Sequence, residues 1–130
     1  MSGYTIKPLS EVPDVLGDYP GEMQMITYEI DAEQSAMTYR RLPPKTGGKG
    51  SYGHRHKTQE EMYFVISGSL QFKLGDDVVD VPAHTAVRVA PEVWRSVWND
   101  GPGDAELFIV SPRVENPRAD AESLEDFWPE

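Results

Sequence analysis

The residues best able to do chemistry lie in one run, GKGSYGHRHKTQEEMYFVISG, which spans residues 48–68. His54 and His56 are two positions apart, so on an extended strand both imidazoles leave the same face and can reach one ion. Glu61 can reach that ion from the next strand. Two imidazoles and a carboxylate form a mixed nitrogen and oxygen ligand set suited to divalent Zn, Mn, Fe, Ni or Co. The sequence therefore predicts a metal site at these three residues, and the alternative is an empty polar cluster inherited from a metal-binding ancestor.

The spacing of this run resembles the first motif of the cupin superfamily. That motif reads glycine, five residues, His-x-His, four residues, glutamate, six residues, glycine, and every defining position is filled, by Gly48, His54, His56, Glu61 and Gly68. The resemblance implies an all-β fold, a double-stranded β-helix or jelly-roll barrel of two antiparallel sheets, like that of small single-domain bacterial cupins. It also implies a divalent metal held by the two histidines and the glutamate.

Glu60 is a competing carboxylate, because the family tolerates a shorter gap after the histidines. Only Glu61 also satisfies the six-residue spacing to Gly68. We therefore expect Glu60 to be solvated.

The second cupin motif is degenerate in this chain. It reads glycine, five residues, Pro-x-Gly, two residues, histidine, three residues, asparagine. When the motif is aligned with HTAVRVAPEVWRSVWN, its first four defining positions fall on His84, Ala90, Glu92 and Arg95, which do not match. Only the fifth position, Asn99, agrees with the motif. The resemblance thus places an arginine where an imidazole would complete the ligand set.

Arg95 cannot be a metal ligand, since a guanidinium has no lone pair to offer and keeps its proton. Two unit charges about 5 Å apart at an effective dielectric of about 20 interact by roughly 3 kcal/mol, and a divalent ion doubles that repulsion. Two arrangements avoid it. In one, the metal is absent and Arg95 pairs with Glu61. In the other, Arg95 leans away from the ion and binds a carboxylate or phosphate of the substrate.

Period-2 alternation places three further polar side chains on the interior face, those of Tyr52, Tyr63 and Asn99. We expect all three to line a substrate pocket together with Arg95. Arg95 and Tyr63 are also the candidates for a catalytic role. The alternative is that the two tyrosines and the asparagine only pack inside the barrel, with their polar groups hydrogen-bonded within the protein.

Short runs rich in Val, Ile, Tyr, Phe and Thr recur along the chain between glycine and proline turn signals. They predict strands over 23–30, 35–42, 50–56, 61–66, 69–74, 77–81, 85–89, 94–98 and 105–111. This pattern is typical of an all-β barrel or sandwich. The last segment, ADAESLEDFWPE, could form a helical turn or two with Leu124, Phe127 and Trp128 docked on the barrel, or could be frayed.

Both faces of several strands carry large apolar residues, and a lone barrel of this size has little with which to cover its outer face. We therefore expect a homodimer. The residues expected near its contact come from the early strands: Met23, Met25, Ile26, Met37 and Tyr39.

With 130 residues the chain is long enough for one domain, and the formal net charge of −10 is unevenly placed. The acidic surplus lies in an N-terminal arm with an early strand, 1–34, and in a C-terminal tail, 114–130, whereas the expected barrel, 35–113, holds nine acidic and ten basic residues. Acidic arms disfavour nucleic acid and anionic membranes as partners. The absence of cysteine and of an apolar leader fits a cytoplasmic protein.

The leading functional hypothesis is a metal-dependent enzyme acting on a small anionic organic molecule, with Arg95 as the anion clamp. The reaction would be of isomerase, oxygenase or lyase type, because fold alone does not fix chemistry. The alternative is a metal-free module that binds or senses a small molecule and holds a Glu61–Arg95 pair. A third hypothesis is a structural oligomer whose pocket is closed by side chains.

The substitution Arg95→His tests the placement of this side chain. It restores a fourth ligand and removes a cation facing the ion, so the affinity for Mn, Ni or Zn should rise at least about tenfold, roughly 1.4 kcal/mol. Calorimetric titration of both proteins measures the change. Unchanged affinity in a folded variant would mean that Arg95 does not face the site.

Overall fold

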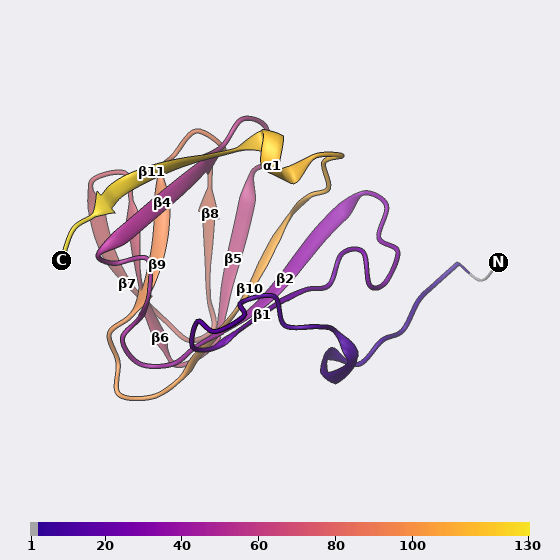
Figure 1. Cartoon of the computed structure of the whole chain (residues 1–130), viewed down its shortest axis with the longest axis horizontal. Helices are drawn as coiled ribbons and strands as arrows, with labels where there is room; N and C mark the ends of the chain where they lie inside the picture. The colour runs from indigo at the N-terminus through magenta and orange to yellow at the C-terminus, as the bar shows by residue number, and fades with distance from the viewer. Residues whose placement is uncertain (1–2) are drawn as a thin grey trace.

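The computed structural model describes residues 3–130, which are almost entirely β-structure (Figure 1). The strands are β1 (Glu22–Met25), β2 (Ser35–Leu42), β3 (Thr46–Gly47), β4 (Ser51–His56), β5 (Glu61–Ser67), β6 (Ser69–Leu74), β7 (Asp77–Pro82), β8 (Thr85–Val89), β9 (Arg95–Asn99), β10 (Ala105–Pro112) and β11 (Ala121–Trp128). The helical segments are the single 3-10 turn η1 (Leu9–Glu11) and the short helix α1 (Pro117–Asp120). Neither is long and apolar enough to cross a membrane.

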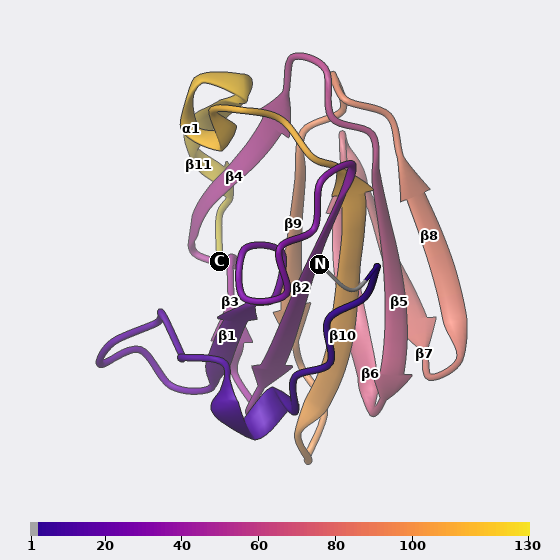
Figure 2. The ribbon, with the colours of Figure 1, turned by 90° about the vertical axis from the view of Figure 1, so that its right-hand side faces the viewer.

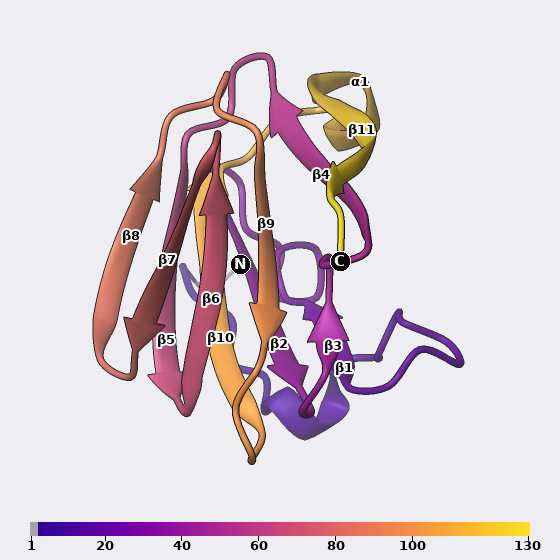
Figure 3. The same cartoon turned by 90° about the vertical axis from the view of Figure 1, so that its left-hand side faces the viewer.

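The strands form two antiparallel sheets. The five-stranded sheet has the order β1-β2-β10-β5-β8, and the six-stranded sheet has the order β11-β4-β9-β6-β7, with β3 paired to β9. Figure 2 looks onto β2 and β10 of the first sheet, and Figure 3 looks from the opposite side onto β6 and β9 of the second. This confirms the expected barrel of two antiparallel sheets.

The core lies between the sheets and follows from the alternation of side chains along each strand. On β5, Tyr63 and Val65 point inward and are buried, whereas Met62 and Phe64 point outward and are exposed. Tyr63 packs edge-on against Phe72 of β6, with the ring centroids 5.2 Å apart. Each fully buried apolar side chain stabilises the fold by roughly 1.5–3 kcal/mol. The ring of Tyr63 therefore belongs to the core, and its hydroxyl donates to Glu61.

The predicted strands agree closely with the observed ones, and the first shows the main difference in the barrel. It was expected over 23–30 but ends at Met25, because the chain turns over residues 26–32, where the Ala32 amide donates to the Thr27 carbonyl at 2.9 Å. Asp31 adopts a positive φ of 58° in this turn. The two-residue strand β3 was not predicted.

The C-terminal segment corrects a second expectation. Its helix is a single turn, begun by Pro117 and capped by the Asn116 side chain, which accepts a hydrogen bond from the Ala119 amide at 3.2 Å. The residues after it form neither a helix nor a frayed tail. They form β11, which pairs with β4 at the edge of the six-stranded sheet. The alternation of apolar residues in this segment is weak, so no strand was predicted there.

Two of the three apolar residues expected to dock from this segment are buried, Phe127 and Trp128, whereas Leu124 is exposed. Gly53 on β4 makes room for Phe127, since a Cβ at this position would lie 2.3 Å from the phenylalanine ring. Residues 121–128 of the acidic C-terminal segment are therefore a strand of the six-stranded sheet.

The outer face of the five-stranded sheet carries apolar side chains in register across three strands. One row is formed by Met37, Val110 and Met62, and a second row by Tyr39, Phe108 and Phe64. Met62 is 51% exposed and Phe64 is 43% exposed. Exposed apolar side chains such as these are what a subunit contact would cover.

The homodimer remains a prediction, with its contact residues adjusted. Met37 is exposed, as a contact requires, and Tyr39 faces the same surface but is already buried. Met25 is also exposed, but its register partner is Thr38, so it lies on the other face of the sheet from Met37. Ile26 is half-buried. Met23 is half-buried and lines the cavity between the sheets, not the outer face. A monomer mass from light scattering at micromolar concentration would contradict the dimer.

Candidate metal centre and adjoining cavity

One oxygen atom of Glu61 is the meeting point of four side chains from both sheets. The Nε2 atoms of His54 and His56, on β4, each lie 3.4 Å from Oε1 of Glu61, on β5. The hydroxyl of Tyr63 donates to the same oxygen at 2.7 Å. Nη1 of Arg95, on β9, lies 3.8 Å from it. The interior between the sheets thus holds the predicted metal residues in one cluster.

The donor atoms fit a metal ion. One ligand atom from each of His54, His56 and Glu61 lies within 4.8 Å of the others, so the three could hold a single ion. His56 and Glu61 are buried and His54 is half-buried. Both ring nitrogens of His56 are buried and without a hydrogen-bond partner among residues 3–130. A buried imidazole normally satisfies its nitrogens, so this one is suited to a ligand role.

The Glu61 carboxyl is held in its charged form, as a metal ligand must be. Burial raises its pKa, but the interactions with His54, His56 and Tyr63 outweigh burial and hold the pKa well below its usual range. For Tyr63, burial and then the charge of Glu61 raise the pKa well above its usual range. Tyr63 therefore remains a protonated donor.

Arg95 lies where the alignment of the second motif predicted it, beside the cluster and in register with His54 across β4 and β9. Its side chain is fully buried, and its Nη2 donates to the Ala90 carbonyl at 2.8 Å. Its Nε and Nη1 have no hydrogen-bond partner in the described chain. At 3.8 Å from Glu61, Arg95 forms an ion pair without a hydrogen bond. Its position therefore lies between a close Glu61–Arg95 pair and an Arg95 that leans away to bind a substrate anion.

Asp120, the last residue of α1, is a site residue that the sequence did not reveal. Its Oδ2 lies 3.3 Å from Nδ1 of His56, on the opposite side of the ring from Glu61. Its carboxylate also accepts hydrogen bonds from the amides of Thr58 and Gln59, at 3.0 and 3.1 Å. A carboxylate behind a ligand histidine orients the ring and raises its basicity.

The Asp120 carboxylate thus anchors the loop between the two ligand strands while facing a ligand ring. Burial raises its pKa, but the hydrogen bonds from Thr58 and Gln59 outweigh burial and lower it. The sequence carried no signal of this role, because Asp120 lies 64 positions after His56, in the acidic segment 114–130.

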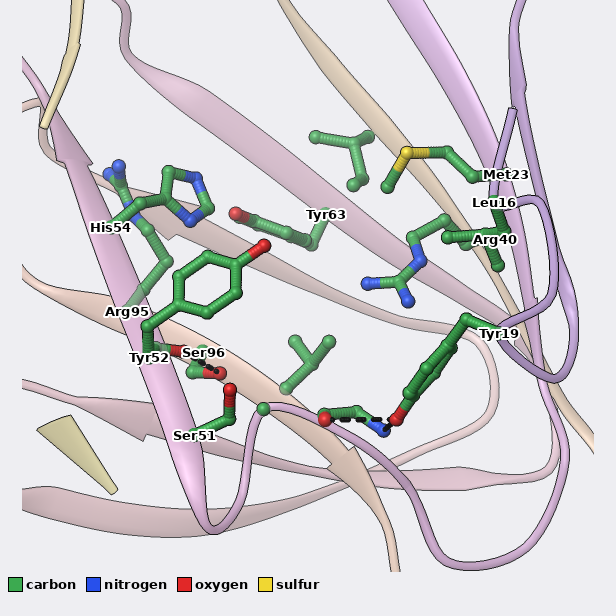
Figure 4. Close-up of a pocket in the computed structure, with 14 residues that line it drawn as sticks. Leu16, Tyr19, Met23, Arg40, Ser51, Tyr52, His54, Tyr63, Arg95 and Ser96 are labelled. Atoms are coloured by element: carbon green, nitrogen blue, oxygen red, sulfur yellow. Dashed lines mark hydrogen bonds between the residues drawn. The ribbon is translucent and has the colours of Figure 1, made fainter. Parts of the chain in front are cut away.

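A cavity of about 490 Å³ opens beside the cluster (Figure 4). This volume suits a small organic molecule. Its lining residues come from both sheets and from the N-terminal segment: Leu16, Tyr19, Met23, Arg40, Gly47, Gly48, Ser51, Tyr52, His54, Tyr63, Arg95, Ser96, Val97 and Ile109. His56 and Glu61 do not line it, so His54 is the metal residue that faces the cavity directly.

The structure separates the three expected pocket residues. Tyr52, which is exposed, and Tyr63 line the cavity as expected. Asn99 does not. Its amide donates to the carbonyls of Leu42 and Gly103, both at 2.8 Å, and its oxygen accepts from the Gly101 amide at 2.9 Å. The side chain is fully buried and both of its N–H groups are taken, so Asn99 fixes the turn after β9 and does not line the cavity.

Glu60 points away from the cluster, as expected, and pairs with Arg88 at the surface, where Nε and Oε2 are 2.5 Å apart. Steric constraints explain why glycine occupies both ends of the first motif, at Gly48 and Gly68. A Cβ at Gly48 would lie 1.7 Å from Oγ of Ser96, and Gly68 has a φ of 72° in the turn between β5 and β6. The first motif thus encodes the ligands together with the backbone that brings them together.

Comparison with known proteins gives consistent results. A family model described as a cupin domain matches residues 40–111. A solved cupin protein from Bacteroides fragilis has a TM-score of 0.71 at 16% identity, and the match covers 89% of each chain. A predicted oxalate decarboxylase from Thermotoga maritima has a TM-score of 0.66 at 19% identity, over 84% of this chain and 99% of that one.

A third solved structure is a domain of a transcriptional regulator of the XRE family from Enterobacter cloacae. Its TM-score is 0.62 at 16% identity, and the match covers 73% of this chain and 98% of that domain. No curated protein matches the chain. At these identities the structural likeness establishes the fold, and the chemistry must be argued from the site.

Asp120→Asn tests the supporting carboxylate. The change keeps the shape of the side chain but removes the charge behind His56, so the divalent metal affinity should fall about 10- to 100-fold. Glu122→Gln is the matched control, since Glu122 lies nearby on β11 and pairs with Arg55, away from the cluster. Calorimetric titration measures the affinities, and a thermal melt checks that the loop anchored by Asp120 is still folded. An Asp120→Asn variant that folds and binds metal like the control would show that the carboxylate does not support the ligand.

Proposed function

The chain belongs to the cupin superfamily, and we propose that it is a metal-dependent enzyme that acts on a small anionic organic molecule. The observation that carries the proposal is the ligand cluster itself: one atom each of His54, His56 and Glu61 within 4.8 Å of the others, with His54 facing a cavity of about 490 Å³. Three protein ligands leave coordination positions open for water or substrate.

Each residue of the cluster has a part in the proposed site. His54, His56 and Glu61 would hold the ion, which would supply Lewis-acid polarisation or oxygen activation when bound. Asp120 orients the His56 ring, and Tyr63, which stays protonated, donates to Glu61 and fixes its carboxylate. These supports hold the ligands in place before any substrate arrives.

Arg95 is the proposed anion clamp and, with Tyr63, the proposed catalytic residue. Its Nε and Nη1 have no hydrogen-bond partner among the described residues, although the side chain lines the cavity. A guanidinium with free N–H groups binds a carboxylate or phosphate well. Such a contact would position an anionic substrate beside His54, at the ligand cluster.

The substrate class is supported by the charges around the cavity. Its lining includes two arginines and a histidine but no aspartate or glutamate. The Thermotoga maritima neighbour is described as a predicted oxalate decarboxylase, and oxalate is a small dianion. Isomerase, oxygenase and lyase chemistry all remain compatible with one ion beside a bound anion.

The second candidate function is a metal-free module that binds or senses a small molecule. It is favoured by the 3.8 Å approach of Arg95 to Glu61, in which the guanidinium charge replaces that of an ion. The likeness to a cupin domain of a transcriptional regulator agrees with a sensing role. In this account the same cavity binds the same class of ligand, and Glu61 pairs with Arg95 permanently.

Location and partners extend the proposal. We propose a cytoplasmic protein, in line with its lack of cysteine, and a homodimer formed through the apolar rows on the five-stranded sheet. A net charge of −10 disfavours nucleic acid and anionic membranes, which leaves a small molecule as the expected partner.

Metal analysis of protein purified without chelator or immobilised nickel tests the enzyme proposal against the binding-module account. We expect about one divalent ion per chain in the wild type and a loss of most of it in Glu61→Gln, because a neutral amide is a poor ligand for such ions. Glu60→Gln is the matched control, since it changes the neighbouring carboxylate, which faces solvent, and should leave the metal content unchanged. A wild type that stays metal-free even after dialysis against Mn, Fe, Zn, Ni and Co would refute the metal-dependent function.

A further inference from the structure

Arg40, on β2, is a cavity residue whose charge no residue in the described chain neutralises. Its Nε is buried and has no hydrogen-bond partner. The neighbours that influence it electrostatically are the hydroxyls of Tyr19, Tyr52 and Tyr63, and no carboxylate is among them. Figure 4 shows its guanidinium pointing into the cavity, on the side away from His54.

Its neighbour in sequence shows what a paired arginine looks like in this protein. Arg41 points to the outer face of the same strand, where it contacts Glu22 at 3.1 Å and Asp104 at 2.9 Å. The two adjacent arginines therefore differ in one respect: the outward one has two carboxylate partners, and the inward one has none. In a chain with 22 acidic residues, an inward guanidinium without an acidic neighbour is unusual.

Arg40 is half-buried and its Nε is fully buried without a partner, which is unfavourable for a charged group. Burial lowers the pKa of Arg40, yet an arginine keeps its proton in a protein, so it cannot escape the cost by becoming neutral. The residue is tolerated because the cavity is open to solvent on one side. An oxyanion that enters the cavity would supply the missing partner through charge-assisted hydrogen bonds.

We propose that Arg40 is a second anion-binding residue, which recognises a carboxylate or phosphate group at the end of the cavity away from the metal ligands. The ring of Tyr19 lies beside it, but the Tyr19 hydroxyl is bonded to the backbone of Gly47 and the Tyr63 hydroxyl to Glu61, so Arg40 itself supplies the binding groups of this subsite (Figure 4). With Arg95 near the ligand cluster, the cavity presents cations from two different strands, β2 and β9. The ligand that fits best is a small organic molecule with an anionic group at each end.

This inference deepens the proposed function by naming the substrate class and rests on it only in calling the ligand a substrate. The binding step itself needs no metal. Its failure and that of the metal site can therefore be told apart, provided that anion binding is measured on protein stripped with chelator and then dialysed.

The test is the thermal shift and calorimetric titration of stripped protein with succinate, inorganic phosphate and, as the uncharged probe, succinamide. We expect succinate or phosphate, but not succinamide, to raise the melting temperature of the wild type. Arg40→Met, which keeps an unbranched chain without the charge, should weaken that binding at least about tenfold, the loss expected for a hydrogen bond to a charged group. Arg41→Met is the matched control and should bind the anion as the wild type does.

A second readout covers the case in which the variant is altered in stability. Without anion, Arg40→Met should melt at or above the temperature of the wild type, because it removes an uncompensated buried charge. The proposal is overturned if neither anion shifts the wild type, if the shift survives in Arg40→Met, or if the anion-free variant melts well below the wild type, which would mean that Arg40 already has a structural partner. Comparing succinate with phosphate identifies the group that the subsite prefers.

Discussion

The site depends on a single carboxylate oxygen, Oε1 of Glu61, which faces two imidazoles, a phenol and a guanidinium inside the barrel. These groups come from both sheets, so the packing of β5 against β4 and β9 sets their distances. A charged carboxylate at this position requires partners that compensate its burial. In the metal-bound state the ion would be the main one, and in its absence the donors around the oxygen share that role. The cluster can therefore fold around Glu61 in either state.

The second constraint is the contrast between an acidic protein and a cationic cavity. The chain carries a net charge of −10, yet no aspartate or glutamate lines the cavity, whereas Arg40 and Arg95 do. Fixed cations inside a low-dielectric wall attract anions more strongly than the same charges at the surface would. We therefore propose that the cavity favours anionic ligands. This is expected both of an enzyme for organic anions and of a module that senses them.

The sequence predicted the barrel and the grouping of His54, His56 and Glu61 because both depend on local spacing. Alternating strands and turn residues fix the sheets, and the first motif fixes which side chains share a face. Arg95 was placed correctly by spacing alone, although the second motif is degenerate. Asn99 was expected in the pocket but does not line the cavity, because alternation shows the direction of a side chain but not the loop carbonyls that bind its amide.

Asp120 and Arg40 could not be assigned because their roles depend on contacts between distant segments. Asp120 reaches His56 only after β11 has paired with β4, and the strand signal of that segment is weak. The inward direction of Arg40 follows from the same alternation that sends Met37 and Tyr39 outward, so its direction was available from sequence. The lack of a carboxylate partner for Arg40 could not be predicted from sequence, since it depends on every element around the cavity.

The central claim, that Glu61 and the two histidines form a metal centre, is tested most directly by anomalous diffraction from crystals soaked in a manganese salt. The account predicts one strong peak within about 2.0–2.3 Å of Nε2 of His54, Nε2 of His56 and a carboxylate oxygen of Glu61. It also predicts that Arg95 remains outside the coordination sphere. Crystals that show no peak at these atoms, with Arg95 still against Glu61, would contradict it.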